Sequence, residues 1–288
     1  MSQVPLVANT RVALDAVLDS LDAGVVHAVV PTMGALHEGH ATLIRAARQH
    51  VGAAGLVTVT IFVNPTQFSA NEDFYRYPRT LQADIDLCAA SGADVVFAPA
   101  VSEVYPTGAT EVTVHPGPLG DVLEGAVRPG HFQGVLTVVN KLFNLTCADV
   151  GFFGEKDYQQ LILIRHMVRD LSMSVEVVGV PTVREPDGLA MSSRNRYLDS
   201  ADRGQAELVP RAISAGSAVA QRGGSSDDVI AEVQRFFDPH LIEVDYVVVT
   251  DPELGPAPVA GEGRLVVAVR VGSVRLLDNS PIQLGAPA

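Results

Sequence analysis

The feature that most limits the fold of this chain is an alternation of short apolar runs with segments of helical spacing along its first two-thirds. Residues 56–63 are β-branched and almost entirely apolar, as in a strand that is covered on both faces. Residues 40–51 place Leu43 and Ala47 on one helical face. This alternation predicts a parallel sheet covered by helices. The expected strands are 25–30, 56–63, 94–97, 150–153 and 175–180, and the expected helices are 40–51, 80–90, 135–145 and 157–168.

The pattern changes at about residue 183. Residues 183–188 are turn-like, and Asp199 can then cap a long helix that extends to about Arg222. A further helix at 227–237 and strands at 244–249, 265–271 and 274–277 follow, with a hairpin turn at 271–274. We therefore expect an α/β domain with a parallel sheet over residues 1–182 and a smaller α+β domain over residues 183–288.

The charge and the composition argue against several classes of protein. The formal net charge is −13, and a surface this acidic repels nucleic acid. No apolar run reaches the ~18 residues of a membrane span, and residues 1–11 lack the pattern of a secretory signal. Cys88 and Cys147 have no metal-ligand spacing and are expected to be buried, reduced thiols. We expect a cytoplasmic protein that binds neither nucleic acid nor membrane.

Polar residues that follow the expected strands are the candidate site, because ligands of parallel α/β sheets bind where the strands end. The first such segment is 31–40, Pro-Thr-Met-Gly-Ala-Leu-His-Glu-Gly-His. Gly34 and Gly39 permit a ligand to approach the backbone, and the helix start offers free N–H groups. His37 and His40 could both donate hydrogen bonds to charge that builds on a phosphate. The alternative is a pair of surface or metal-binding histidines.

Polar side chains also follow the second expected strand. Asn64 and Gln67 lie beside Phe62 and Phe68 in the sequence. A pocket of this mixed character suits a small substrate that bears hydroxyl and methyl groups. The alternative is a proline-containing turn that Asn64 caps.

A third polar segment follows the expected strand at 150–153. Lys156 is a mobile positive charge that suits phosphate oxygens. Asp157 could accept a hydrogen bond from a ribose hydroxyl or a substrate group, and Gln160 lies one helical turn beyond Lys156. The alternative is a solvated helix start.

The fourth segment is the loop 189–197 at the expected domain border. Ser192, Ser193 and Arg194 could wrap the β- and γ-phosphates of a nucleotide. A loop in this position could also close over the nucleotide. The alternative is an ordinary polar linker.

These four segments, in this order and spacing, resemble the pantothenate synthetase family along essentially the whole chain. The stretch 31–40 matches the adenylate-binding motif of that family. Met-Ser-Ser-Arg-Asn at 191–195 stands where the related class I aminoacyl-tRNA synthetases carry a Lys-Met-Ser-Lys-Ser loop. The resemblance implies membership of the nucleotidyltransferase superfamily. It also implies a Rossmann-like N-terminal domain that binds nucleotide and pantoate, a small C-terminal lid domain and a homodimer.

The resemblance further implies a ligase that forms a carbon–nitrogen bond. Pantoate and ATP would give pantoyl adenylate and pyrophosphate, and β-alanine would then give pantothenate and AMP. The implied catalytic residues are His37, His40, Lys156 and Arg194, with His40 as the proton donor. The implied ATP contacts are Met33, Gly34, Ala35, Leu36, His37, Glu38, Gly39, His40, Gly154, Glu155, Lys156, Asp157, Val183, Met191, Ser192, Ser193 and Arg194. The implied pantoate contacts are Asn64, Gln67, Val138, Val139 and Gln160, and Gln67 would also lie near β-alanine.

The chemistry also requires Mg²⁺ to neutralise the triphosphate. Some relatives build a cation site from two consecutive Asp residues and a Gln. The matching positions here are Ala83, Asp84 and Leu87. Because only Asp84 has a ligand side chain that matches, we expect the metal to be carried by the phosphates.

Two other functions fit the same segments. An adenylyl- or cytidylyltransferase would share the strand–loop–helix site and use another acceptor. A non-catalytic regulator would bind the nucleotide without any reason to gather His37, His40, Lys156 and Arg194 around one phosphate chain. A tRNA synthetase is disfavoured by the acidic surface and by the lack of length for an anticodon-binding domain.

Overall fold

The computed structural model describes residues 4–68, 74–108 and 110–285. The chain divides into two compact units. The first comprises residues up to Glu155 together with Gln159–Pro181, and the second comprises Lys156–Tyr158 together with the residues from Thr182 onward. The division at 181/182 lies close to the expected domain border, but residues 156–158 belong with the second unit. Each unit is described by itself.

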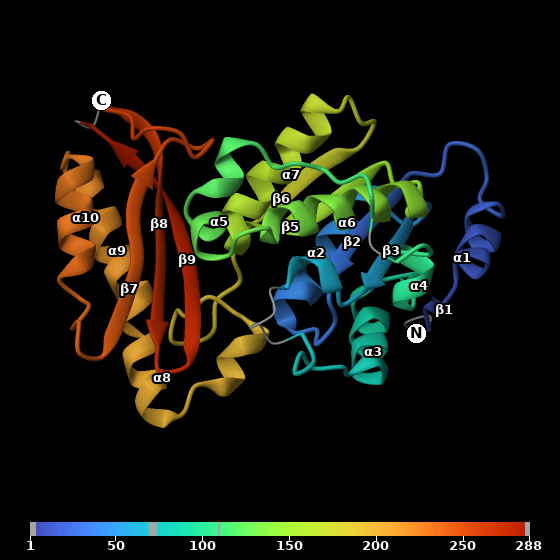
Figure 1. The fold of residues 1–288 in the computed structure, drawn as a ribbon, viewed down its shortest axis with the longest axis horizontal. Coiled ribbons are helices and arrows are strands. Elements are labelled where there is room, and N and C mark those ends of the chain that lie inside the picture. The colour runs from blue at the N-terminus through green and yellow to red at the C-terminus, as the bar shows by residue number, and fades with distance from the viewer. Residues whose placement is uncertain (1–3, 69–73, 109, 286–288) are drawn as a thin grey trace. The chain divides into compact units, whose positions relative to one another are not determined.

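The first unit is built on a six-stranded parallel sheet in the order β1-β4-β3-β2-β5-β6. Figure 1 shows these strands with helices packed around them. The strands are β1 (Leu6–Ala8), β2 (His27–Thr32), β3 (Leu56–Ile61), β4 (Val95–Phe97), β5 (Val150–Gly154) and β6 (Glu176–Val180). The helices are α1 (Arg11–Leu18), α2 (Glu38–Val51), α3 (Leu81–Ser91), α4 (Val101–Val104), α5 (Glu124–Val127), α6 (His131–Thr146) and α7 (Tyr158–Asp170), of which Tyr158 belongs to the second unit. Two short 3₁₀ turns are η1 (Pro65–Gln67) and η2 (Pro118–Asp121), and a third, η3 (Glu155–Asp157), is divided between the two units after Glu155.

Alternate residues of β5 face helices on opposite sides of the sheet. Phe152 belongs to the core that includes Ile44 and Ala47 of α2. Phe153 makes an edge-to-face contact with Phe143 of α6, with ring centroids 6.0 Å apart. Since successive side chains of a strand point to opposite faces, α2 and α6 cover the two faces of the sheet. This arrangement explains why β5 is apolar along its whole length.

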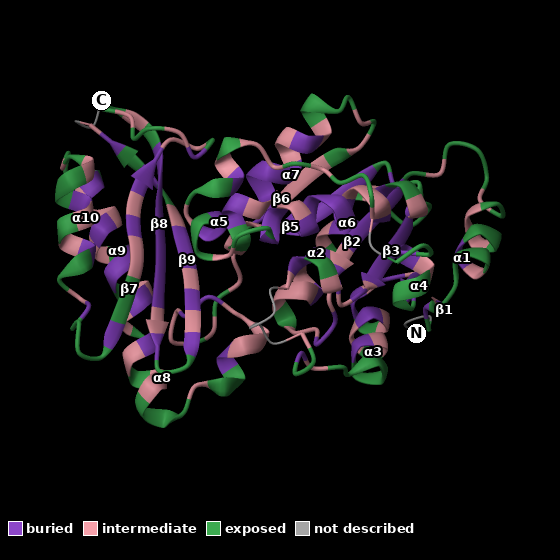
Figure 2. Cartoon of the chain, viewed as in Figure 1, coloured by how far each residue is buried: buried purple, intermediate pink, exposed green. Residues whose placement is uncertain are grey.

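The second unit is an antiparallel sheet of three strands covered by helices. The strands are β7 (Ile242–Thr250), β8 (Gly261–Val271) and β9 (Val274–Leu284), in that order, and the helices are α8 (Ser200–Ala206), α9 (Leu208–Gln221) and α10 (Ser226–Gln234), with the 3₁₀ turn η4 (Ser193–Tyr197). Side chains of α9 and α10, including Ile213 and Val233, share one buried core with the sheet. Figure 2 shows how much of the two sheets and of α6 is buried.

The structure confirms the predicted fold class, and every strand and helix predicted in the first unit falls on an observed element. The hairpin turn is also confirmed, because Val271 pairs with Val274 across Gly272, whose φ is +52°. Asp199 caps α8 as expected, since its side chain accepts from Ala201 N and Asp202 N.

Two predictions were wrong. The single helix expected from Asp199 to Arg222 is two helices, α8 and α9, that meet at Glu207. Pro210 has no N–H to donate to the carbonyl of Ala206, so a continuous helix would lose that bond and clash with the proline ring. Cys88 is buried as predicted, whereas Cys147 is exposed at the end of α6.

Within the described part of the chain, every helix is too short or too polar to cross a membrane.

Candidate active site

The order of the strands places a topological switch point, where the strand order reverses direction across the sheet, between β2 and β5. From β2 the chain continues to β3 and β4 on one side, whereas β5 and β6 lie on the other side. Crevices for ligands form at the carboxyl ends of the strands that flank such a point. The loop that follows Thr32 and the turn that follows Gly154 are therefore the places where this fold offers a site.

The loop after β2 ends in a reciprocal cap in which both predicted imidazoles take part. His37 is the N-cap of α2, and its Nδ1 accepts from Gly39 N at 3.1 Å. Nδ1 of His40 accepts from His37 N at 3.2 Å, and the ring centroids lie 4.2 Å apart. Because a backbone N–H can only donate, each Nδ1 must act as the acceptor, and a neutral ring then carries its proton on Nε2. The local backbone therefore sets both rings as Nε2–H donors at the N-terminus of α2.

Two glycines make this loop geometry accessible. A Cβ on Gly39 would lie 2.9 Å from Cε1 of His37, so only glycine leaves room for that ring. Gly34 has a φ of +82°, a conformation that glycine adopts without strain. A side chain at either position would move the loop or the imidazole.

Asp84 anchors the loop from α3. Its side chain is buried, and its two carboxylate oxygens accept from Ala35 N at 3.0 Å and Leu36 N at 2.8 Å. The hydroxyl of Thr80 also donates to it, at 3.0 Å. A carboxylate with its oxygens directed at backbone N–H groups is poorly suited to bind a cation. Both oxygens of Asp84 are thus engaged by the protein, which suits a residue that anchors the loop.

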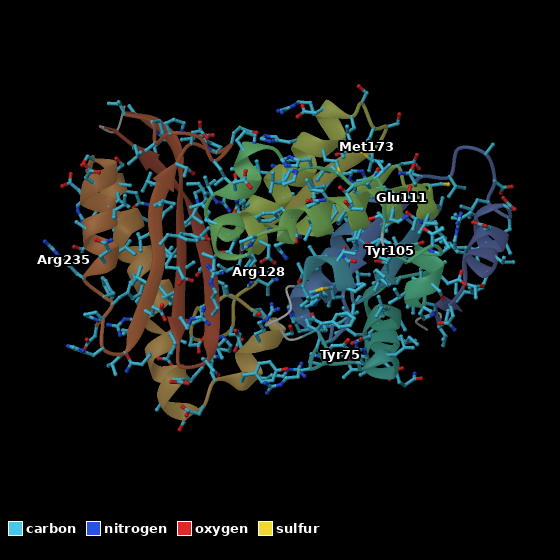
Figure 3. All side chains as sticks on the ribbon, in the orientation of Figure 1. Tyr75, Tyr105, Glu111, Arg128, Met173 and Arg235 are labelled. Atoms are coloured by element: carbon cyan, nitrogen blue, oxygen red, sulfur yellow. The ribbon has the colours of Figure 1, made fainter. Side chains whose placement is uncertain are left out.

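Gln67 ends the 3₁₀ turn η1, and the surrounding residues hold both its side chain and its backbone. Its Oε1 accepts from Asn64 Nδ2 at 3.1 Å, and its Nε2 lies 3.3 Å from the sulfur of Met33. The carbonyl of Gln67 accepts from Nδ1 of His131 at 2.9 Å, since a carbonyl can only accept. Arg128, labelled in Figure 3, lies beside His131, with Nη1 3.0 Å from its Nε2.

Asn64 is the buried cap of this turn, which is the alternative that the sequence left open. Its Oδ1 accepts from Thr66 N and from the hydroxyl of Tyr105 at 2.8 Å, and its Nδ2 donates to Gln67 and to the carbonyl of Gly134 at 3.2 Å. Tyr105, labelled in Figure 3, follows α4. The hydrogen-bonding groups of Asn64 thus point at protein partners, and its position suits holding Gln67 in place.

The other residues predicted to bind pantoate lie on α6 and α7. Val138 and Val139 are buried in α6. Gln160 is half-buried, whereas its neighbour Gln159 is buried and holds the segment 119–124 through bonds to Leu119 O, Val122 O and Glu124 N. The sequence analysis predicted Gln160 as a pantoate contact, and the structural hydrogen bonds to segment 119–124 are made by Gln159.

The predicted phosphate contacts from Lys156 onward belong to the second unit. The side chain of Lys156 is 22% exposed, and its Nζ lies 3.5 Å from Oδ1 of Asp157, which is half-exposed. Ser192 accepts from Arg194 N at 3.3 Å and so caps the 3₁₀ turn η4. Met191 N donates to Val183 O at 2.9 Å, which closes the loop at its base.

The site residues thus form two sets, one in each unit. The first unit holds the histidine loop with Gln67 and the valines of α6, and the second holds Lys156, Asp157 and the loop that ends at Arg194. Their convergence on one triphosphate stays a prediction. The sequence did not identify Asp84 as the anchor of the loop, and no local signal could, because its partners lie 48 and 49 residues away.

Donors at a helix N-terminus beside the switch point of a parallel sheet are what Rossmann-like enzymes use to hold the phosphates of nucleotides. Fold and site place the chain in this class. The model of the family "Pantoate-beta-alanine ligase" matches residues 6–281. The chain therefore belongs to the pantoate-beta-alanine ligase family, and the predicted family and enzyme class, a ligase, are confirmed.

Relatives of known name agree with this assignment. The chain is 54% identical to a pantothenate synthetase of a Nocardioides species, over 99% of this chain and 87% of the relative. It is 56% identical to the pantothenate synthetase of Mycolicibacterium smegmatis, over 90% and 82% of the two chains. The crystal structure of pantothenate synthetase from Thermus thermophilus matches with a TM-score of 0.88 and 46% identity, over 96% of this chain and 98% of that one.

A further solved structure carries ligands. It is a pantoate-beta-alanine ligase from Francisella tularensis in complex with beta-gamma ATP and beta-alanine. It matches with a TM-score of 0.79 and 33% identity, over 96% of this chain and 97% of that one.

Proposed function

We propose that this chain condenses pantoate with β-alanine to give pantothenate, with ATP converted to AMP and pyrophosphate through pantoyl adenylate. Membership of the pantoate-beta-alanine ligase family supports pantoate as the acid and β-alanine as the amine that are joined. The observation that carries the mechanism is the reciprocal cap of His37 and His40, which sets two imidazoles as Nε2–H donors at a helix N-terminus.

In the first step, a carboxylate oxygen of pantoate attacks the α-phosphorus of ATP, and the bond from that phosphorus to the β-phosphate bridging oxygen breaks. Nε2–H of His37 and His40 would donate to the phosphate oxygens as charge builds on them. Lys156 and Arg194 would bind the β- and γ-phosphates, and Ser192 and Ser193 would line their path. Pyrophosphate then leaves.

In the second step, the amine of β-alanine attacks the carbonyl carbon of the adenylate. The new carbon–nitrogen bond forms, the bond to the phosphate oxygen breaks, the nitrogen loses a proton and AMP leaves. Positioning suffices for this step, and no covalent nucleophile is required. Gln67 and Gln160 would hold pantoate, with Val138 and Val139 against its methyl groups, and Gln67 would also line the path of β-alanine.

One role differs from the one that the resemblance implied, and the expected binding of Mg²⁺ by the phosphates is kept. We assign Asn64 to holding Gln67, because its amide bonds to protein groups on both sides. We assign Mg²⁺ to the phosphates of the substrate, because the carboxylate of Asp84 is directed at the N–H groups of Ala35 and Leu36.

The proposal includes a homodimer in the cytoplasm. The dimer rests on the family resemblance, and sedimentation equilibrium would show a mass twice that of the chain. The cytoplasmic location is supported by Cys147, an exposed free thiol, which suits a reducing compartment.

Exchange of labelled pyrophosphate into ATP tests the reaction. We expect exchange that requires pantoate, followed by AMP formation when β-alanine is added. Exchange that requires a different acid would indicate another adenylyltransferase. Binding of ATP without AMP formation in the presence of pantoate and β-alanine would favour the non-catalytic regulator.

A further inference from the structure

Two consecutive polar residues are buried in β9 of the second unit. Asp278 is 1% exposed and Asn279 is 4% exposed. Buried polar groups are costly unless they are hydrogen-bonded, so their partners show what they hold in place. The partners include the two segments that carry the predicted phosphate contacts.

Asn279 holds the segment of Lys156. Its Nδ2 donates to the carbonyl of Lys156 at 3.0 Å, and its Oδ1 accepts from Nε of Arg264 at 2.8 Å. The guanidinium of Arg264 stacks over the ring of Tyr158, 3.8 Å from its centroid. The hydroxyl of Tyr158 in turn donates to Pro252 O at 3.0 Å. The backbone of Lys156 and the ring of Tyr158 are therefore both held by later residues of the second unit, namely Pro252, Arg264 and Asn279.

Asp278 holds the base of the loop that leads to Arg194. Its Oδ2 accepts from Nη1 of Arg184 at 2.7 Å, and its Oδ1 accepts from Nη2 at 2.9 Å. A bidentate pair of this kind fixes direction as well as distance. Arg184 also pairs with Ala190 through a β-bridge, and its Nη1 donates to Gly188 O at 3.0 Å. The ion pair thus closes the loop just before Met191.

We propose that Asp278 and Asn279 are positioning residues for adenylation, which hold the Lys156 segment and the Arg194 loop in one fixed arrangement within the second unit. This inference rests on the proposed function, which assigns Lys156 and Arg194 to the same triphosphate. The lysine side chain is flexible, so its ammonium reaches a reproducible position only if its backbone is held. A shift of about 1 Å in a positioned group can cost about 100-fold in rate.

The variant Asn279→Asp tests the contact to Lys156 with little change in shape. It keeps an oxygen for Arg264 to bond and replaces the amide donor with an oxygen that repels the carbonyl of Lys156. We expect pantoate-dependent pyrophosphate exchange to fall by about 10- to 100-fold. Attack of β-alanine on pre-formed pantoyl adenylate, measured in a single turnover, should change by less than about threefold, because the β- and γ-phosphates that Lys156 would bind are absent from the adenylate.

A double variant separates positioning of the ammonium from a general structural effect. In a Lys156→Ala background the carbonyl of residue 156 is still present, but the ammonium is gone. If Asn279 acts through Lys156, adding Asn279→Asp to Lys156→Ala should slow exchange by less than about twofold. A merely structural role would slow exchange by the same factor in both backgrounds, and that result would overturn the inference.

Arg275→Gln provides the matched control. Arg275 lies on the same strand and is partly buried, and it forms an ion pair with Asp245 of β7. We expect exchange within about twofold of the unmodified chain; a loss equal to that of Asn279→Asp would also overturn the inference. Unchanged exchange in Asn279→Asp would contradict this inference alone, whereas no exchange in the unmodified chain would overturn the proposed function and this inference with it.

Discussion

At the scale of single residues, the local backbone decides which atom of each site histidine can donate. Nδ1 of His37 and Nδ1 of His40 accept backbone N–H groups. Nε2–H is the remaining donor of each neutral ring. The same two histidines can therefore cap the helix through Nδ1 and donate to a phosphate through Nε2.

His40→Asn should separate the two tasks, because asparagine can still accept from His37 N but has no group at the position of Nε2. We expect adenylation to slow by about 10²–10³-fold, the scale of one lost transition-state donor. Pre-steady-state formation of pantoyl adenylate measures this rate. A loss below threefold with the fold intact would remove His40 from the mechanism.

His27, at the start of β2, makes stability depend on pH. Burial lowers its pKa from 6.5 to about 4, although Asp149 and Asp94 act in the opposite direction. Its Nε2 lies 2.7 Å from Oγ1 of Thr58. Between pH 6.5 and 4 the unfolded chain binds a proton that the folded chain excludes, so this contribution to stability is present above pH 6.5 and is lost as the pH falls through this window.

The expected loss from His27 is about 3 kcal/mol of unfolding free energy across that window. Urea unfolding at pH 7 and pH 4.5 measures it. His27→Gln should flatten this part of the pH dependence, and a matched change at His50, His50→Gln, should leave it in place. An unaltered slope in His27→Gln would show that other groups cause the dependence.

At the scale of elements, the site depends on one close approach of a helix to a turn. A Cβ on Gly134 of α6 would lie 2.4 Å from the carbonyl oxygen of Thr66 and 2.7 Å from the backbone nitrogen of Gln67. These are backbone atoms of η1 and its end, so they cannot move without shifting Gln67. The glycine therefore sets how closely α6, with Val138 and Val139, packs on η1.

Gly134→Ala should cost about 1–3 kcal/mol of stability through overpacking. Because the displaced atoms belong to the turn of Gln67, KM for pantoate should also rise, with little change in ATP binding. Gly204→Ala is the control, since Gly204 is also helical and a Cβ there meets nothing within 4 Å. Equal effects of the two substitutions would contradict the role given to Gly134.

The 3₁₀ turn η4, which carries Arg194, should act on one step of the reaction only. Arg194 would bind phosphates that leave as pyrophosphate, so Arg194→Ala should slow adenylation by about 10²-fold and leave attack of β-alanine nearly unchanged. Single-turnover measurements of the two steps provide the comparison. Equal slowing of both steps would contradict this role.

At the scale of the whole molecule, the sequence predicted what depends on local patterns. Apolar runs and helical spacing predicted the strands and helices around the parallel sheet, and the position of the polar segments after strands predicted the site. The three-residue strand β1 was too short to show a pattern, and the break between α8 and α9 depended on one residue, Pro210. Length and periodicity thus decide which elements can be predicted.

Contacts between distant segments account for the rest. Asn279 lies 123 residues from Lys156, and Asp84 lies 49 residues from Ala35. Each is an ordinary strand or helix residue in its own segment, so only the folded chain shows what it holds. The sequence therefore offers candidate ligand contacts, which stay predictions, and it did not predict the positioning roles of Asp84 and Asn279, which depend on distant partners.

The central claim is that the histidine loop of the first unit and Lys156 of the second bind one triphosphate. A crystal structure with pantoate and a non-hydrolysable ATP analogue tests it most directly. We predict Nε2 of His37, Nε2 of His40 and Nζ of Lys156 within about 3 Å of phosphate oxygens of a single nucleotide. Phosphates bound away from the imidazoles, or by the imidazoles without Lys156, would contradict the account.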